Sequence, residues 1–157
     1  MADLHKCTVA ELKATLTAAE VVALPKAVTA AGAESEEAWL QEKLLQACDR
    51  VVSAVGACER NPRIKPGVCK VPGGLVHTTL VLARHAVIAS LPGMSETLEG
   101  SSRAAEYSTA VQDLARVASC ELFVADYAGS EDPDVEGGEG GMLLIHGEKP
   151  FNWVGIW

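Results

Sequence analysis

The chain has 157 residues, a formal net charge of -8, and 48% hydrophobic but only 4% aromatic residues, a composition that suits one domain and excludes intrinsic disorder of the whole chain. Acidic residues outnumber basic ones 21 to 13, which disfavours a protein that grips nucleic acid, because Lys and Arg supply the affinity for phosphate. No apolar run approaches the roughly 20 residues that cross a bilayer, and the N-terminus lacks a signal-peptide pattern, so we expect a soluble protein made in the cytoplasm.

The first predicted helical segment covers residues 8–24. Thr8 and Glu11 have the spacing of a capping box, in which two side chains satisfy free backbone amides at a helix start. Thr17 and Glu20 repeat this pattern and predict a second, short helical turn. We expect Pro25 to end that turn, because proline lacks a backbone donor, and we interpret the Ala-rich stretch 26–33 as a linker.

The clearest helix is predicted from Ser35 to about Cys58. Ser35 has the side chain of an N-cap, and the two glutamates that follow it suit the positive end of the helix dipole. An apolar stripe then runs along the segment at helical spacing. Its members are Leu40, Leu44, Cys48, Val51 and Val55.

The stretch 59–74 contains three prolines and three glycines, which exclude a continuous helix. It also holds four of the chain's thirteen basic residues, and no other stretch is as basic. Two interpretations stay open: a solvated loop with scattered charge, or a docking loop for an acidic partner. The residues of this predicted docking loop are Arg60, Arg63, Lys65 and Lys70.

Two further helices are predicted along the chain. Residues 75–91 are apolar on most faces, which indicates a central helix covered on more than one side. The next helix is expected from Ser102, a candidate N-cap, to about Val124, with the ring of Tyr107 in the core and its hydroxyl outward. The fold class is therefore all-α: a small bundle of about four helices with a long loop and an extended C-terminal tail.

The composition changes after Tyr127. Residues 117–148 contain no Lys or Arg, and 137–141 read GGEGG, which is typical of a flexible acidic linker. We therefore divide the chain into a helical domain, residues 1–127, and an acidic Gly-rich linker with an aromatic tail, residues 128–157. The tail either folds back over its own core or anchors on a partner, in which case the large apolar anchors are Phe151, Trp153, Ile156 and Trp157.

The five cysteines contain no CxxC spacing, which argues against a zinc or dithiol motif. We interpret Cys48 and Cys120 as small buried apolar groups on helices. A disulfide between Cys58 and Cys69, which flank a loop, is geometrically conceivable, but a reducing compartment disfavours it.

No catalytic motif, metal site or cofactor is predicted. His77 and His85 lie about two helical turns apart, too far to share one metal ion on a rigid helix. A Cys–His nucleophile pair could be assembled from Cys69 or Cys120 with either histidine, but nothing in the sequence selects one. A small enzyme is therefore the least favoured hypothesis.

The order of these segments resembles the head-to-tail adaptor (neck, or connector) proteins of tailed phages, especially the Mu-like branch. The residues that carry the resemblance are the helix AWLQEKLLQACDRVVSAV, a loop that ends in KVPGGL, the apolar helix LVHTTLVLARHAVIASL, and the helix AAEYSTAVQDLARVAS after Arg103. The resemblance covers about residues 36–124. The loop ACERNPRI lacks the tyrosine often seen there, and the acidic tail lies outside the family's pattern.

The resemblance implies a structural virion protein of the phage neck, assembled in the host cytoplasm. About twelve copies would form a homo-oligomeric ring below the portal protein, with heterologous contacts between the copies. The other partner would be a tail or head-closure protein, and DNA would pass through the acidic ring without specific binding. The alternative from a different class is a cytosolic helical module that binds or regulates other proteins.

Overall fold

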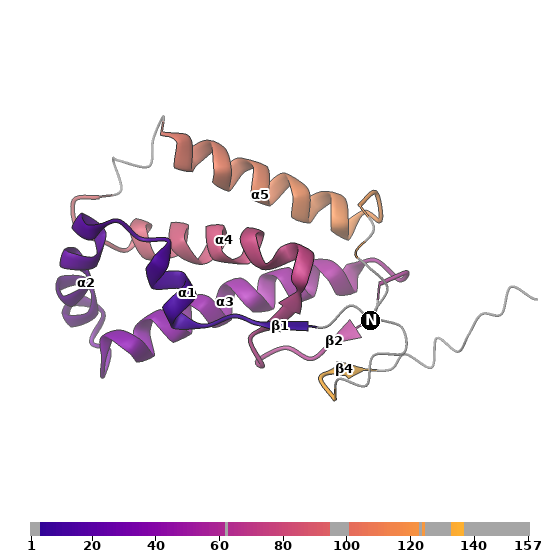
Figure 1. Ribbon diagram of the computed structural model, residues 1–157, viewed down its shortest axis with the longest axis horizontal. Coiled ribbons are helices and arrows are strands. Elements are labelled where there is room, and N and C mark those ends of the chain that lie inside the picture. Colours follow the sequence, from indigo (N-terminus) through magenta and orange to yellow (C-terminus); the bar gives the residue numbers. More distant parts are fainter. Residues whose placement is uncertain (1–3, 62, 95–100, 123, 125–132, 137–157) are drawn as a thin grey trace, which may run out of the picture.

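The computed structural model describes residues 4–61, 63–94, 101–122, 124 and 133–136. This part of the chain is mostly helical, with two small antiparallel sheets of two strands each, so the all-α class is confirmed. Figure 1 shows the arrangement. The helices are α1 (Val9–Ala14), α2 (Ala18–Ala31), α3 (Glu36–Ala57), the 3₁₀ turn η1 (Gly73–Leu75), α4 (Val76–Ala89) and α5 (Ser102–Ala118), and the strands are β1 (Leu4–Lys6), β2 (Arg63–Ile64), β3 (Lys70–Pro72) and β4 (Val135–Glu136).

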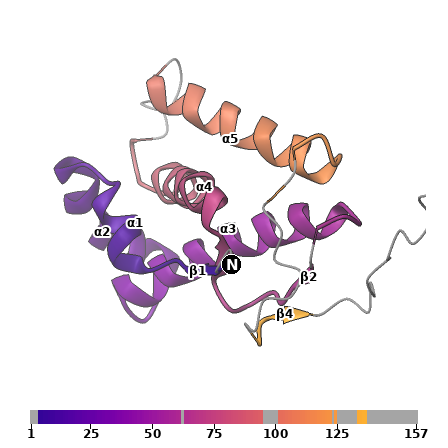
Figure 2. The ribbon, with the colours of Figure 1, turned by 45° about the vertical axis from the view of Figure 1, so that its right-hand side comes forward.

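Helices α3, α4 and α5 pack against one another and form the body of the described fold. Figure 2 looks along α4, which lies between α3 on one side and α5 on the other. The apolar stripe predicted for α3 is buried, and four of its five members are fully inaccessible to solvent. Helix α4 buries residues around most of its circumference, which confirms the central helix expected from its sequence: Thr78, Thr79, Val81, Leu82, Ala83, Val87 and Ile88.

The N-terminal helices begin as their sequence predicts. Both capping boxes form: the side chain of Thr8 accepts from the Glu11 amide, and that of Thr17 accepts from the Glu20 amide. The prediction for Pro25 is wrong, because α2 continues through it to Ala31 and the expected linker is helical. Burial of the apolar face of α2 against α3 offsets the missing donor, and the helix stops only at Gly32, whose φ of 66° suits glycine.

Helix α5 is shorter than predicted. Ser101, not Ser102, is the N-cap, and the helix ends at Ala118 instead of near Val124. Cys120 adopts a left-handed φ of 62°, and the amide of Glu121 donates to the carbonyl of Arg116. This hydrogen bond and the left-handed backbone of Cys120 reverse the chain at the end of α5. Glycine usually takes this position at a helix end, so the cysteine gave no signal for it in the sequence.

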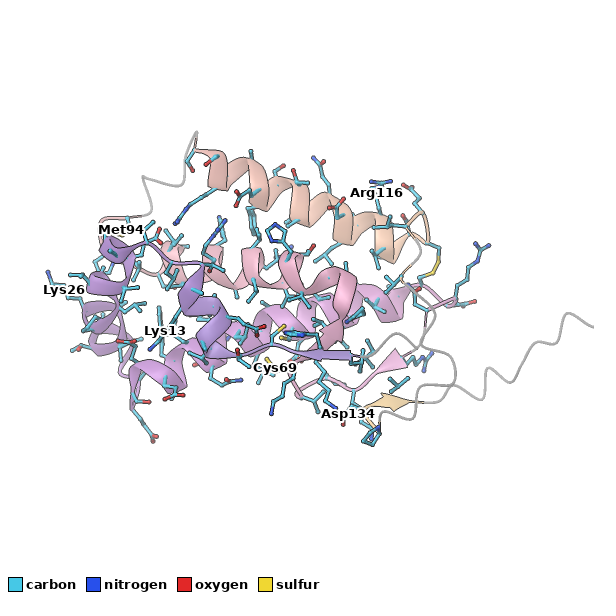
Figure 3. The ribbon with its side chains drawn as sticks, viewed as in Figure 1. Lys13, Lys26, Cys69, Met94, Arg116 and Asp134 are labelled. Atoms are coloured by element: carbon cyan, nitrogen blue, oxygen red, sulfur yellow. A yellow bond between two sulfur atoms is a disulfide. The ribbon has the colours of Figure 1, made fainter. Side chains whose placement is uncertain are left out.

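The structure corrects two predictions about cysteines. Cys120 is not a lone buried group on a helix but forms a disulfide with Cys58, whereas Cys48 is buried on α3 as expected. The conceivable bridge from Cys58 to Cys69 is therefore not formed. The disulfide lies where the C-terminal ends of α3 and α5 meet, and it appears as a yellow bond in Figure 3.

The short sheets connect segments that are far apart in sequence. Strand β1 pairs with β3, with His5 opposite Val71, and β2 pairs with β4, with Ile64 opposite Val135. Both β2 and β3 lie in the stretch that the sequence identifies only as a loop. The stretch is therefore not a plain loop, because it contains two short strands that contact α3.

Candidate interaction site

The basic loop, residues 59–74, is held against α3. The amide of Gly67 donates to Asp49 Oδ1 on α3 over 2.8 Å, and Gly67 has a φ of 82°, which glycine adopts without strain. Ile64 and Val71 point into the core, with 5% and 0% of their surface exposed. The backbone of the loop is therefore fixed while its basic side chains remain at the surface.

An acidic segment of the same chain, Pro133–Glu136, lies on this loop. Its backbone pairs with β2, and the Lys65 amide donates to the Asp134 carbonyl over 2.8 Å. The side chain of Lys65 donates to the Pro133 carbonyl over 2.8 Å, and Lys70 forms an ion pair of 2.6 Å with the Asp134 carboxylate. Figure 3 marks Asp134 at this position. Charge and strand pairing together fix residues 133–136 to the helical body.

The four predicted docking residues have two different environments. Lys65 and Lys70 contact the chain's own acidic segment, a contact that we did not predict from the sequence. The opposite charges of the basic and acidic stretches are visible in the sequence and could have indicated it. Arg60 and Arg63 keep exposed side chains, so binding of an external acidic partner stays a prediction that concerns these two arginines.

The predicted tail anchors, Phe151, Trp153, Ile156 and Trp157, lie outside the described residues, as does the proposed domain boundary at residue 127. The last residue that the structure describes is Glu136, whose backbone pairs with Arg63 of the basic loop.

A second cluster of polar side chains joins α3, α4 and α5. The imidazole of His85 stacks on the ring of Tyr107 with 3.7 Å between centroids, and Arg50 donates to the Tyr107 hydroxyl over 3.4 Å. Burial lowers the pKa of His85, and the charge of Arg50 lowers it further, so both favour the neutral imidazole. Arg84 pairs with Glu106, and this hydrogen bond lowers the pKa of the Glu106 carboxyl. These contacts hold α5 against α3 and α4. The ring of Tyr107 is partly buried against the core, and its hydroxyl accepts from Arg50 at the surface.

A cavity of about 350 Å³ lies between α4 and α5. Buried Val81 and Ala110 line it together with the exposed side chains of His77 and Glu106. Most of the residues that line the cavity have polar side chains, and nothing in their arrangement selects a reaction.

The cysteines of the conceivable Cys–His pairs have other partners. Cys120 is held in a disulfide, and the Cys69 thiol is hydrogen-bonded to Cys48. Among the described residues, no group of three or more His, Cys, Asp or Glu side chains is arranged to hold a metal ion. The same residues contain no helix that is long and apolar enough to cross a membrane.

Comparison with protein-family models, with characterised proteins and with solved structures finds no match to the chain.

Proposed function

We propose that this chain is the subunit of a head-to-tail adaptor ring in the neck of a tailed phage. The observation that carries the proposal is the attachment of the acidic segment 133–136 to the basic loop. A helical body that holds residues 133–136 beside the basic loop suits a subunit whose following residues contact a neighbour during ring assembly. The resemblance supports the same conclusion, because its residues correspond to α3, the basic loop, α4 and α5.

The C-terminal residues would supply the contacts that such a ring needs. Phe151, Trp153, Ile156 and Trp157 lie within the last seven residues, and burial of a large apolar side chain contributes about 1.5–3 kcal/mol. Aromatic side chains are frequent hot spots of interfaces, and a ring repeats each contact in every subunit. We assign these four residues to binding the portal protein or the adjacent subunit.

The charge of the chain suits two further surfaces of a neck protein, the contact with a neighbouring protein and the wall of the DNA channel. Arg60 and Arg63 are exposed on the basic loop and would contact an acidic surface of a neighbour. The net charge of -8 would repel the phosphates of DNA and let the duplex slide through the ring. The proposed location is accordingly the virion neck, below the portal and above the tail.

The experiment compares the full chain with a chain that lacks residues 149–157. Each is co-expressed with the portal protein encoded in the same genome, and the purified particles are examined by negative-stain electron microscopy. The full chain is expected to add a ring to the portal, whereas the shortened chain remains folded by circular dichroism but adds none. The deletion of residues 149–157 leaves the described core intact, because α1–α5 are formed by residues 9–118.

A matched variant keeps the full length of the chain and replaces Phe151, Trp153, Ile156 and Trp157 with Ser. It is expected to fail in the same way, because the anchors and not the length supply the binding energy. Normal assembly of the shortened chain would refute the anchoring role. A monomer that binds no portal in any form would favour the alternative, a cytosolic helical binding module with its tail held on its own loop.

A further inference from the structure

Three free thiols from distant parts of the sequence meet in the core beside the basic loop. Cys7 follows β1, Cys48 lies in the middle of α3, and Cys69 immediately precedes β3. All three are buried, with 2%, 1% and 5% of their surface exposed. Figure 3 marks Cys69 at the centre of the molecule, next to α3 and β1.

The side chains of Cys48 and Cys69 are in direct contact. Their Sγ atoms lie 3.0 Å apart, so an approach of about 1 Å brings them to the length of a disulfide bond. Cys7 belongs to the cluster through its backbone, because its amide donates to the Cys69 carbonyl over 3.0 Å. We propose that Cys48 and Cys69 form a second disulfide when the chain is oxidised, and that this bond locks the basic loop onto α3.

The existing disulfide makes the reaction chemically accessible. A chain that carries the Cys58–Cys120 bond has already met an oxidant, and the same oxidant can act on a second pair of thiols. With oxidised glutathione, the Cys69 thiolate attacks one glutathione sulfur, forms a mixed disulfide and releases one glutathione. The Cys48 thiolate then attacks Cys69 Sγ and releases the second glutathione. Two protein thiols are oxidised, one glutathione disulfide is reduced, and the two thiol protons end on the two glutathione molecules.

The two thiols share a hydrogen bond in which either sulfur can be the donor. With Cys48 as the donor, the bond lowers the pKa of Cys69 and raises that of Cys48. Cys69 also lies in the loop, two residues after the exposed Gly67, and 5% of its surface is exposed against 1% for Cys48, so Cys69 is the thiol closer to an oxidant in solvent. Thiolate character and access are the two conditions for thiol–disulfide exchange.

The bond would change the loop that carries the candidate interaction site. Cys58 already ties the start of the basic loop to the end of α5, and Cys69 would tie its middle to α3. Strand β2 lies between these two points and holds the acidic segment 133–136. The inference does not depend on the adaptor function, because it concerns only the chain's own thiols.

The test equilibrates the purified full chain with glutathione buffers of increasing oxidised fraction. Remaining thiols are then blocked with N-ethylmaleimide in denaturant and counted by intact mass. The chain with only its Cys58–Cys120 bond carries three blocked thiols, and formation of the second bond reduces the count to one. A non-reducing tryptic digest is expected to contain residues 44–50 linked to residues 64–70.

Three variants complete the test. Cys7→Ser is expected to keep the cross-link, whereas Cys48→Ser and Cys69→Ser lose it. The digest of the unmodified chain decides the question even if a variant folds poorly. Three blocked thiols at every buffer composition that preserves Cys58–Cys120 would overturn the proposal, as would a cross-link to Cys7. Uptake of Zn²⁺ that protects all three thiols would also overturn it and would assign the cluster to metal binding.

Discussion

Two lysines of the basic loop determine where the acidic C-terminal segment meets the helical body. Lys65 binds the backbone of this segment, and Lys70 binds the Asp134 carboxylate. The side chains of Lys70 and Asp134 are 23% and 22% exposed, so solvent weakens their attraction only in part. The pair is therefore worth more than a fully exposed ion pair, although strand pairing also holds the segment.

The contribution of Lys70 can be measured at one backbone amide. Replacement of Lys70 with Gln is expected to destabilise the attachment of residues 133–136 by about 1 kcal/mol, the upper range for partly exposed pairs. The Lys65 amide, which donates to the Asp134 carbonyl, should then exchange its hydrogen about fivefold faster. Lys26→Gln, an exposed change on α2, serves as the control. Equal exchange rates in Lys70→Gln and the unmodified chain would show that Lys70 does not hold the segment.

The pairing of Cys58 with Cys120 could not be predicted from the sequence. Cys58 and Cys120 are 62 residues apart, and only the packing of α3 beside α5 brings their Cα atoms to 5.3 Å. Cysteine spacing alone does not determine connectivity. The burial of Cys48 could be predicted, because it lies on the apolar stripe of a long helix.

Helix α2 is the element in which local propensity and tertiary packing disagree most. Pro25 lies inside the helix, has no amide to donate to the carbonyl of Val21, and is exposed. The helix nevertheless forms, because a capping box starts it and Leu24, Ala27 and Val28 are buried on one face. Proline in α2 is thus a local cost that tertiary contacts offset.

Replacement of Pro25 with Ala is therefore expected to stabilise the protein. Alanine restores the backbone donor and removes no buried contact, so the free energy of unfolding should rise by about 1–3 kcal/mol in urea titrations. The neighbouring exposed change Lys26→Ala should alter it by no more than about 0.5 kcal/mol. A Pro25→Ala variant no more stable than the unmodified chain would contradict this explanation of α2.

The helices and the strands differ in how far the sequence predicts them. Helix α3 has an N-cap, acidic residues in its first turn and an apolar stripe along its twenty-two residues, and these signals agree with one another. Strands β2 and β4 have two residues each, too few to show an alternating pattern, and each is defined only by its partner. The candidate site therefore needed the three-dimensional structure, although the opposite charges of its two segments are visible in the sequence.

In the described part of the molecule, a helical body and a short acidic segment can be distinguished. The body is formed by α3, α4 and α5, with polar contacts such as the Arg84–Glu106 pair between its helices. The acidic segment 133–136 attaches to the basic loop beside this body, and the sequence after it includes Phe151, Trp153, Ile156 and Trp157. In the proposed neck subunit, the helical body would form the ring wall and these four residues would contact its neighbours.

Immunogold electron microscopy of virions released from the host tests the proposal that the chain is a component of the phage neck. The antibody is raised against residues 1–127. We expect gold at the junction of head and tail, and tryptic peptides of the chain in the same purified particles. Virions that carry neither gold at the junction nor peptides of the chain would contradict it.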